Sequence, residues 1–401
     1  MTQENSPRSY SHERQRKSTH RHDASPHSNT ARTALKQRSN HILTLLTPHA
    51  TIPAIKEAKQ QKQTAIAATH NTTTNNSYNS EPPLAHKSNI LKMRKIIGIG
   101  ETILDIIFKN EQPTAAVPGG STFNGIISLG RLGLPVTMIT ETGNDKIGRI
   151  IKDFMADNGV DNTHVCVYDD GRTAISLAYL NERNDAEYLF YKDYPNARLD
   201  VEWPEVNEND IIMMGSYFVL NPVLRPKVKE FLDYAKSRNA MIYYDINFRS
   251  SHCSEAIKLY GTILENFEYA SIVRGSTEDF NNMFGIKDPE EAYKREVSFY
   301  CKYMMCTDAD GDIRLFTPQY TQLFPVKKID TVSTIGAGDN FNAGIIYGLM
   351  KENVCADSLA NVQPEQWNRI ISHGQNFAAE VCQSLSNSIS KDYANNYGKQ
   401  Q

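Results

Sequence analysis

The stretch TVSTIGAGDNFNAG, residues 331–344, decides the fold that the sequence predicts. A β-branched run ends at Ile335 and breaks into Gly336-Ala337-Gly338, after which apolar residues recur at helical spacing. Residues this small leave room for a ligand at a strand-to-helix junction. The first helical turn has free amide groups and the positive end of the helix dipole, so the junction predicts an anion site suited to phosphate.

Asp339 directly follows the last of these glycines. A carboxylate beside a bound phosphate is repelled unless a proton or a cation lies between them. We therefore interpret Asp339 as a base that takes a hydroxyl proton while the amides hold the phosphoryl group. The alternative is a tight turn in which Asp339 only caps the helix.

Residues 1–92 differ in composition from the rest of the chain. They contain 13 Lys and Arg against 5 Asp and Glu, no glycine, and many Ser, Thr, Asn, Gln and His residues. Such a segment buries too little apolar surface to offset its conformational entropy, so we expect a disordered basic extension. A transit peptide and a nucleic-acid-binding arm are the alternatives, although Arg and aromatic residues do not interleave. Our preferred interpretation takes Met93 as the real start, with the preceding residues unstructured or not normally made.

Other signals of location are few. No run of 18 apolar residues occurs, and no secretory signal is recognisable, so we expect neither a membrane span nor secretion. The six cysteines have no CxxC spacing. They favour buried thiols in a reducing cytoplasm over disulfides or a zinc site.

From residue 94 onward, strand-like and helix-like segments alternate with short connections, which predicts a parallel sheet covered by helices. Residues 163–192 differ, because they contain short alternating strands with turn residues between them. We expect these strands, with strands near 103–118, to form a small lid over a site. The polar residues 389–401 predict a C-terminal tail.

Three positions early in this region could bind a substrate. Asp105 interrupts an apolar run, where a carboxylate is either a paired core residue, an edge charge or an acceptor for sugar hydroxyls. Gly119-Gly120 precedes a predicted helix that carries Asn124, and the glycines let a ligand approach the backbone closely.

The sequence DINFR at 245–249 ends another buried strand. Ligands of open parallel sheets collect at the carboxyl ends of strands, so polar residues here indicate a binding site. The alternative is an Arg249–Asp245 ion pair that only fixes the loop.

Taken in order, four stretches resemble the ribokinase/PfkB family of carbohydrate kinases, and its fructokinase-like members in particular. They are the strand with Asp105, the Gly119-Gly120 pair with Asn124, DINFR, and IGAGDNFNAG at 335–344. The resemblance covers about residues 93–388. It implies a ribokinase-like α/β fold, in which a doubly wound, mostly parallel sheet has helices on both faces and a small β-sheet lid. Sugar would lie between lid and body, and ATP along the later strands.

The resemblance also implies roles for individual residues. Asp339 would be the catalytic base, and Gly336, Ala337 and Gly338 would form the anion hole for the γ-phosphate. The implied substrate-binding residues are Asp105, Gly119, Gly120, Asn124, Lys192 and Arg249, and the implied nucleotide-binding residues are Asn247, Ser276, Asp279, Thr307 and Gly311. No residue is expected to bind a metal directly, and Asp279 could reach Mg²⁺ only through water.

The chain departs from the family pattern at four places. One is the glycine-rich nucleotide loop, which is reduced here to Thr307, Ala309 and Gly311. Ser333-Thr334 stands where the family has Asp-Thr, which argues against a bound monovalent cation. Ser276 and Asp279 stand where the family has Asn-x-x-Glu, and the shorter aspartate alters the expected metal geometry. Lys192 stands where fructokinase-like and ketodeoxygluconate-kinase-like members tend to have arginine. Lysine cannot grip a carboxylate at two points, which favours a neutral sugar such as fructose.

We therefore predict an ATP-dependent, Mg²⁺-assisted kinase that phosphorylates a primary hydroxyl of a small neutral sugar. One alternative is an adenosine-like nucleoside kinase of the same fold. Another is a sugar-binding or regulatory protein with weak catalysis, suggested by the substitutions at Ser276, Asp279, Ser333 and Ala309. Sugar and ATP are the expected partners, nucleic acid and membranes are not, and a homodimer through the lid stays open.

Overall fold

The computed structural model describes residues 94–182, 186–308, 311–326, 328–397 and 399. The basic extension predicted over residues 1–92 lies outside this part of the chain. Within it, ten strands form a main sheet. Nine of them follow the order β14-β13-β12-β11-β10-β9-β1-β4-β5. The tenth, β6, pairs with residues 140–143 of β4, after residues 136–137, which pair with β5. Their bounds are β1 (Ile96–Ile99), β4 (Val136–Gly143), β5 (Val160–Asp161), β6 (Val165–Tyr168), β9 (Ile211–Gly215), β10 (Met241–Asp245), β11 (Ile272–Ser276), β12 (Met304–Thr307), β13 (Ile313–Phe316) and β14 (Thr321–Phe324).

The main sheet is parallel except at one edge. All pairs from β12 to β5 and β6 are parallel, and β13 and β14 add an antiparallel edge. The central strands are continuous apolar runs, such as IIMMG in β9, as expected where helices cover both faces. The chain moves from β1 outward to β4, then returns to β9 on the other side of β1. In open α/β sheets, ligands bind outside the carboxyl ends of the strands at a reversal of this kind.

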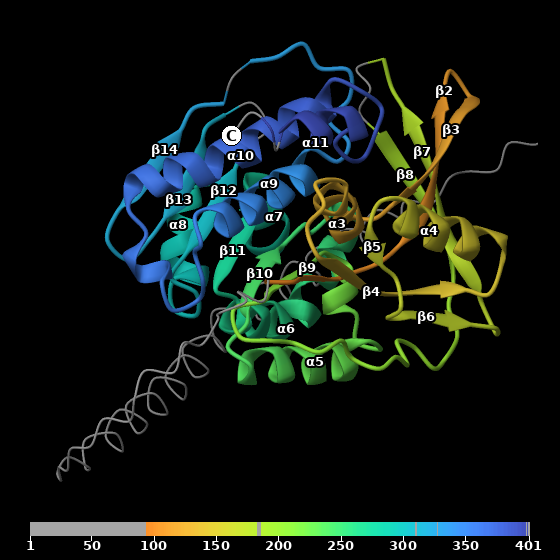
Figure 1. Ribbon diagram of the computed structural model, residues 1–401, viewed down its shortest axis with the longest axis horizontal. Helices are drawn as coiled ribbons and strands as arrows, with labels where there is room; N and C mark the ends of the chain where they lie inside the picture. Colours follow the sequence, from red (N-terminus) through yellow and green to blue (C-terminus); the bar gives the residue numbers. More distant parts are fainter. Residues whose placement is uncertain (1–93, 183–185, 309–310, 327, 398, 400–401) are drawn as a thin grey trace, which may run out of the picture. The chain divides into compact units, whose positions relative to one another are not determined.

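Two apolar cores lie on opposite faces of the main sheet, because alternate strand residues point to opposite sides. The first core packs against α3 (Ser121–Arg131), α4 (Lys146–Asp157), α9 (Ala337–Lys351), α10 (Pro364–Cys382) and α11 (Lys391–Tyr397). The second packs against α5 (Arg225–Ser237), α6 (Ala256–Tyr269), α7 (Thr277–Phe284) and α8 (Pro289–Ala292). Figure 1 shows α9 and α10 on one side of the sheet, and α5 and α6 on the other. Short helical turns span Tyr217–Leu220, Ser250–Glu255, Tyr293–Val297 and Leu359–Asn361.

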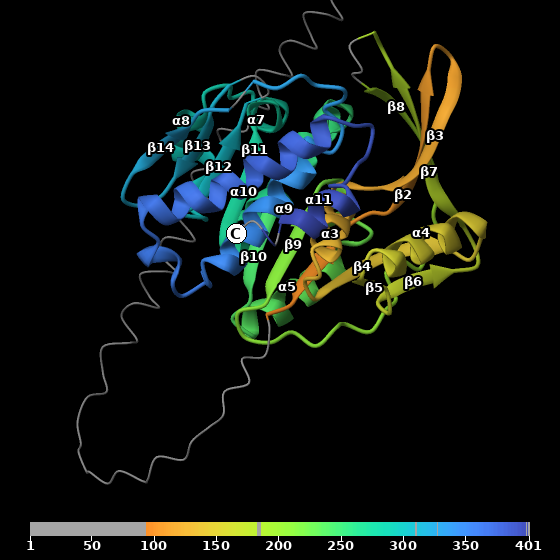
Figure 2. The same cartoon turned by 45° about the horizontal axis from the view of Figure 1, so that its top comes forward.

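A separate small sheet stands beside the main one (Figure 2). It contains β2 (Ile103–Lys109), β3 (Gln112–Gly119), β7 (Arg172–Leu180) and β8 (Ala186–Asp193) in the order β3-β2-β7-β8. Two antiparallel hairpins, β2-β3 and β7-β8, meet through the parallel pair β2-β7. The predicted α/β fold with a small second sheet is therefore what the structure has.

Two predicted boundaries differ from the structure. The lid strands were expected over 163–192, but Val165–Tyr168 forms β6 and pairs with β4 in the main sheet. The polar tail expected over 389–401 contains a helix, α11, in which Ala394 and Tyr397 are buried. Tyr397 packs edge-on against Phe377 of α10, which explains why this polar segment folds.

Candidate active site

The glycine junction forms a turn into α9. Gly336 is the N-cap residue with φ of 77°, and a Cβ atom there would lie 2.9 Å from the Asn387 carbonyl oxygen, so glycine is required for two reasons. The Ala337 amide donates to the Thr334 carbonyl at 3.2 Å. The amides of Gly336 and Gly338 donate to no atom among the described residues. Two of the three predicted anion-hole amides are therefore available to a ligand.

Asp339 lies in the first turn of α9 and is partly exposed. Its Oδ2 atom accepts a hydrogen bond of 2.8 Å from Nδ2 of Asn124 on α3. Burial raises the pKa of Asp339 to about 6, and the nearby Asp245 carboxylate adds to this rise, while Asn124 and Arg249 oppose it. A carboxylate with a pKa this close to neutrality can both accept and release a proton.

Asp105 lies on β2, in the small sheet, and is buried. The Ser176 hydroxyl on β7 donates to its Oδ1, and Nδ2 of Asn387 donates to its Oδ2 at 3.3 Å. Burial raises its pKa to about 6 despite these two donors. A Cβ atom on Gly119 would lie 2.2 Å from Oδ2, so this glycine makes room for the Asp105 carboxylate.

Gly120 is needed for its backbone conformation. It is the N-cap of α3 with φ of 132°, and a Cβ atom would lie 2.2 Å from the Glu101 carbonyl oxygen. The turn at Gly120 thereby starts α3 so that Asn124, in its first turn, reaches Asp339.

Arg249 and Tyr188 connect the two carboxylates electrostatically. The guanidinium of Arg249 is exposed and close enough to lower the pKa of both Asp105 and Asp339. Tyr188, on β8, has its pKa raised to about 12 by burial and, to a smaller degree, by Asp105 and Asp339. Residues from β2, β8, the end of β10 and α9 therefore converge on one site.

The structure gives Asp245 a different partner from the alternative that the sequence suggested. Asp245 Oδ1 accepts a 2.9 Å bond from Nη1 of Arg274 on β11, rather than from Arg249. Arg274 Nη2 also donates to the Thr307 hydroxyl at 2.7 Å. A Cβ atom on Gly338 would lie 3.1 Å from Arg274 Nη2. This buried cation therefore lies directly behind the predicted anion hole at 336–338, which we also call the nest.

Ser276 and Asp279 form a capping box at the start of α7. Asp279 Oδ2 accepts bonds from the Ser276 amide and hydroxyl at 2.6 and 2.7 Å. Its Oδ1 accepts a 2.6 Å bond from the Phe248 amide. Asp279 therefore fixes the loop after β10, where Asn247 has a positive φ of 40°.

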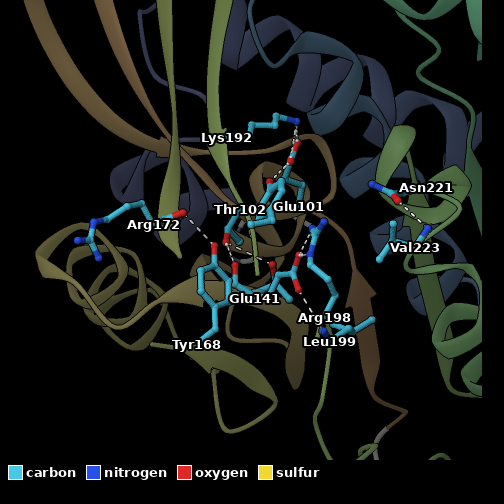
Figure 3. Close-up of polar contacts among 12 residues, drawn as sticks. Glu101, Thr102, Glu141, Tyr168, Arg172, Lys192, Arg198, Leu199, Asn221 and Val223 are labelled. Carbon is cyan, nitrogen blue, oxygen red and sulfur yellow. Dashed lines mark hydrogen bonds and ion pairs between the residues drawn. The ribbon is translucent and has the colours of Figure 1, made fainter. Parts of the chain in front are cut away.

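Lys192 was predicted to bind substrate, but its ammonium group already has a partner. It donates to Oε1 and Oε2 of Glu101 at 2.7 and 2.9 Å, and the Tyr194 hydroxyl donates to the same Oε1 atom. Figure 3 shows this pair beside a second, buried ion pair between Arg198 and Glu141. These contacts tie the end of β8 to the loop after β1.

Several residues at the site were not identified from the sequence. Asn387, Ser176 and Arg274 contact predicted site residues but lie outside the four stretches that resemble the family. Gly311, predicted to bind nucleotide, lies after β12, where a Cβ atom on it would lie 3.0 Å from Cβ of Asp308. Among the described residues, no three His, Cys, Asp or Glu side chains are grouped as metal ligands would be. No helix in that part of the chain is long and apolar enough to span a membrane.

Residues 93–392 match the model of the pfkB family carbohydrate kinases. The chain belongs to this family. It is 25% identical over 276 residues to fructokinase-1 of Zea mays, covering 64% of this chain and 83% of the relative. The family assignment and the predicted enzyme class, a phosphotransferase acting on a sugar hydroxyl, are thereby confirmed.

Solved kinases of this family share the fold. Aminoimidazole riboside kinase from Salmonella enterica, complexed with aminoimidazole riboside and an ATP analogue, aligns with a TM-score of 0.65 and 20% identity, covering 76% of this chain and 99% of that one. A fructokinase double mutant from Vibrio cholerae O395, bound to fructose, ADP and potassium, gives 0.64 and 20%, covering 75% and 95%. The predicted ribokinase-like fold is confirmed.

Proposed function

We propose that this pfkB kinase transfers the γ-phosphate of ATP to a primary hydroxyl of a small neutral sugar, with Asp339 as the base. The observation that carries the proposal is the position of Asp339. It lies in the turn that presents the Gly336 and Gly338 amides, and Asn124 holds its carboxylate at 2.8 Å. Its pKa of about 6 leaves it ionised, yet basic enough to take a hydroxyl proton, at neutral pH.

The proposed reaction has one bond-making step. Asp339 takes the proton of the sugar hydroxyl, the hydroxyl oxygen forms a bond to the γ-phosphorus, and the bond from that phosphorus to the β-γ bridging oxygen breaks. ADP leaves with the electron pair. The Gly336 and Gly338 amides stabilise the transferred group, and the buried Arg274 guanidinium, paired with Asp245, lies behind them.

The proposed sugar side includes Asp105, Gly119, Gly120, Asn124 and Arg249, with Asp105 and Asn124 as the hydroxyl ligands. The Lys192–Glu101 ion pair supports a neutral sugar. Because Glu101 already neutralises Lys192, binding a sugar acid there would require breaking that pair. Lys192 is then a neighbour of the sugar rather than a partner for a carboxylate.

The proposed nucleotide side lies along Asn247, Ser276, Asp279, Thr307 and Gly311, at the carboxyl ends of β10, β11 and β12. ATP enters as its magnesium complex. Asp279 accepts three hydrogen bonds from Ser276 and Phe248, and we propose that it would reach magnesium only through a water molecule. The bound ATP analogue and ADP in the two solved kinases support this choice of cosubstrate.

A nucleoside is the second candidate substrate, because aromatic rings lie on the inner face of the small sheet. Tyr188 and Phe190 share the face of β8 that pairs with Ala178 and Ser176, and their rings stack at 5.8 Å. Phe190 is 46% exposed and could stack on a nucleobase. The aminoimidazole riboside bound to the Salmonella enterica enzyme favours the same idea.

The test measures ADP release with ATP and a panel of D-fructose, 2-keto-3-deoxygluconate, adenosine and aminoimidazole riboside. We expect D-fructose to give the highest kcat/KM, and a nucleoside in first place would favour the second candidate. Asp339→Asn should keep sugar affinity, measured by calorimetry, and lower kcat by about 10²–10⁴-fold. Unchanged turnover in this variant would rule out Asp339 as the base.

We also propose that two copies pair through the outer face of the small sheet. Tyr179, Leu189 and Tyr191 are 39%, 49% and 52% exposed, and their strand positions alternate with the residues that face the site. An antiparallel hairpin sheet usually has one solvated polar face, whereas these three exposed side chains of the outer face are apolar or aromatic.

A further inference from the structure

The segment after α10 reaches the centre of the site. Asn387 is only 2% exposed, although it lies in an irregular stretch between α10 and α11. Its carbonyl oxygen accepts a 2.9 Å bond from Nδ2 of Asn340 and lies against Gly336, while its Nδ2 donates to Asp105. One residue thus contacts both the start of α9 and the carboxylate on the small sheet.

The residues next to Asn387 hold it firmly. The Ser388 hydroxyl donates to the Asn124 carbonyl at 3.1 Å, and the Ile389 amide donates to the Ser128 hydroxyl at 3.1 Å. Both acceptors belong to α3, which also positions Asn124 toward Asp339. The chain next to Asn387 is therefore anchored to the helix that bears the partner of Asp339.

Two Asn–Asp pairs of the same design face the site. Asn124 donates to Asp339 and Asn387 donates to Asp105, and in both amides the buried Oδ1 atom has no partner among the described residues. A buried acceptor without a donor is costly, on the order of 1–3 kcal/mol. In each pair the asparagine holds the carboxylate through its Nδ2 group.

Gly119 supports this interpretation. A Cβ atom there would lie 2.2 Å from Asp105 Oδ2 and 3.1 Å from Asn387 Nδ2. Glycine therefore makes room for the Asp105 carboxylate and its Asn387 donor together. A side chain at position 119 would therefore crowd both members of the Asn387–Asp105 pair.

We propose that Asn387 is a positioning residue for the sugar. It orients the Asp105 carboxylate toward the sugar hydroxyls and fixes its place relative to the phosphate nest at Gly336. This inference rests on the proposed sugar kinase activity. Asn387 acts on sugar binding through Asp105, so its loss affects the sugar and not ATP.

The test compares Asn387→Asp, Asn387→Ala and the control Asn158→Asp in steady-state assays with D-fructose and ATP. Asn158 is also buried but caps α4, where it contacts Arg131 and Phe154. For Asn387→Asp we expect the KM for fructose to rise about tenfold with the KM for ATP within about twofold. Asn387→Ala should raise the KM for fructose less, and the control should leave both unchanged.

A pH profile separates positioning from general structural damage. The carboxylate in Asn387→Asp lies beside Asp105 and disfavours its ionised form, so the acidic limb of kcat/KM for fructose should move to higher pH by about one unit. An unmoved limb with unchanged KM values would overturn the proposal. So would KM values for fructose and ATP that rise together with a lowered melting temperature.

A third measurement keeps this test independent of the proposed function. The ¹³C signal of the Asp105 carboxyl carbon, assigned with Asp105→Asn, is titrated in the free wild-type protein and in Asn387→Asp. If the wild type phosphorylates no fructose, the proposed sugar is wrong, but a higher midpoint in Asn387→Asp still supports the Asn387–Asp105 coupling. An identical midpoint in both proteins overturns that coupling.

Discussion

The carboxyl groups of Asp105 and Asp339 make the stability of the folded protein depend on pH. Both carboxyls have pKa values raised from 3.8 to about 6, chiefly by burial. Between these values the folded protein holds protons that the unfolded chain has released. Stability is therefore lost as the pH rises through this window and stays reduced above it. A buried carboxylate that stabilised the fold would behave in the opposite way.

This sign leads to a prediction about stability. Asp105→Asn and Asp339→Asn should each raise the free energy of unfolding at pH 8, by on the order of 1–3 kcal/mol, because the amide needs no ionisation. The gain should vanish below about pH 4. Urea unfolding at several pH values measures it, and Asp153→Asn on the exposed face of α4 is the control. A loss of stability at pH 8 in both variants would contradict the prediction.

The sequence predicted the residues that lie in motifs and missed those that reach the site from elsewhere. Asp339 and Asn124 could be paired in advance because the family resemblance assigns both to one site. Asn387 could not, since it lies in a polar stretch without periodicity, 282 positions from Asp105. Arg274 was missed because a single arginine within a strand gives no sign of which carboxylate it will meet.

At the scale of elements, the loop after β10 depends on the start of α7. Asp279→Ala removes the acceptor for the Ser276 amide, the Ser276 hydroxyl and the Phe248 amide. We expect a loss of about 2–4 kcal/mol in unfolding free energy, because the buried Phe248 amide is left unpaired. The KM for sugar should also rise, since the same loop carries Arg249.

The matched control for this prediction is Asp288→Ala. Asp288 caps the short helix α8 by accepting from the amides of Glu290 and Glu291, but it is exposed and far along the chain from the loop after β10. We expect it to cost about 0.5–1 kcal/mol with no change in the KM for sugar. Equal losses from both variants, by urea unfolding, would mean that Asp279 acts only as a helix cap.

The elements that the sequence misassigned share a physical cause. The apolar, β-rich residues of Val165–Tyr168 indicate a strand, but a local pattern does not say which sheet the strand joins. For α11, the apolar contacts come from Tyr393, Ala394 and Tyr397 within a segment that is otherwise polar. Its folding depends on α10, which a local pattern cannot represent.

At the scale of the whole described unit, the site is built where two sheets meet. The small sheet supplies Asp105, Ser176 and Tyr188, and the main sheet with its helices supplies Asn124 and Asp339. Ile335, just before the nest, packs against the inner face of the small sheet at Ile107 and Ala178. In the proposed reaction, the position of the small sheet would set the distance between the sugar and the transferred phosphate, so a contact that fixes this sheet is expected to affect catalysis.

A homodimer that forms through the outer face of the small sheet would fix the position of that sheet. We expect the wild type to sediment as a dimer at micromolar concentration, and Leu189→Lys with Tyr191→Lys to give a monomer, because two buried cations at an apolar contact are unfavourable. Leu323→Lys is the matched control, since Leu323 is equally exposed on β14 at the opposite edge of the main sheet. The monomeric variant should also show a higher KM for sugar, as its small sheet is less constrained. A wild-type monomer at this concentration, or a double variant that remains dimeric, would show that the outer face does not hold two copies together.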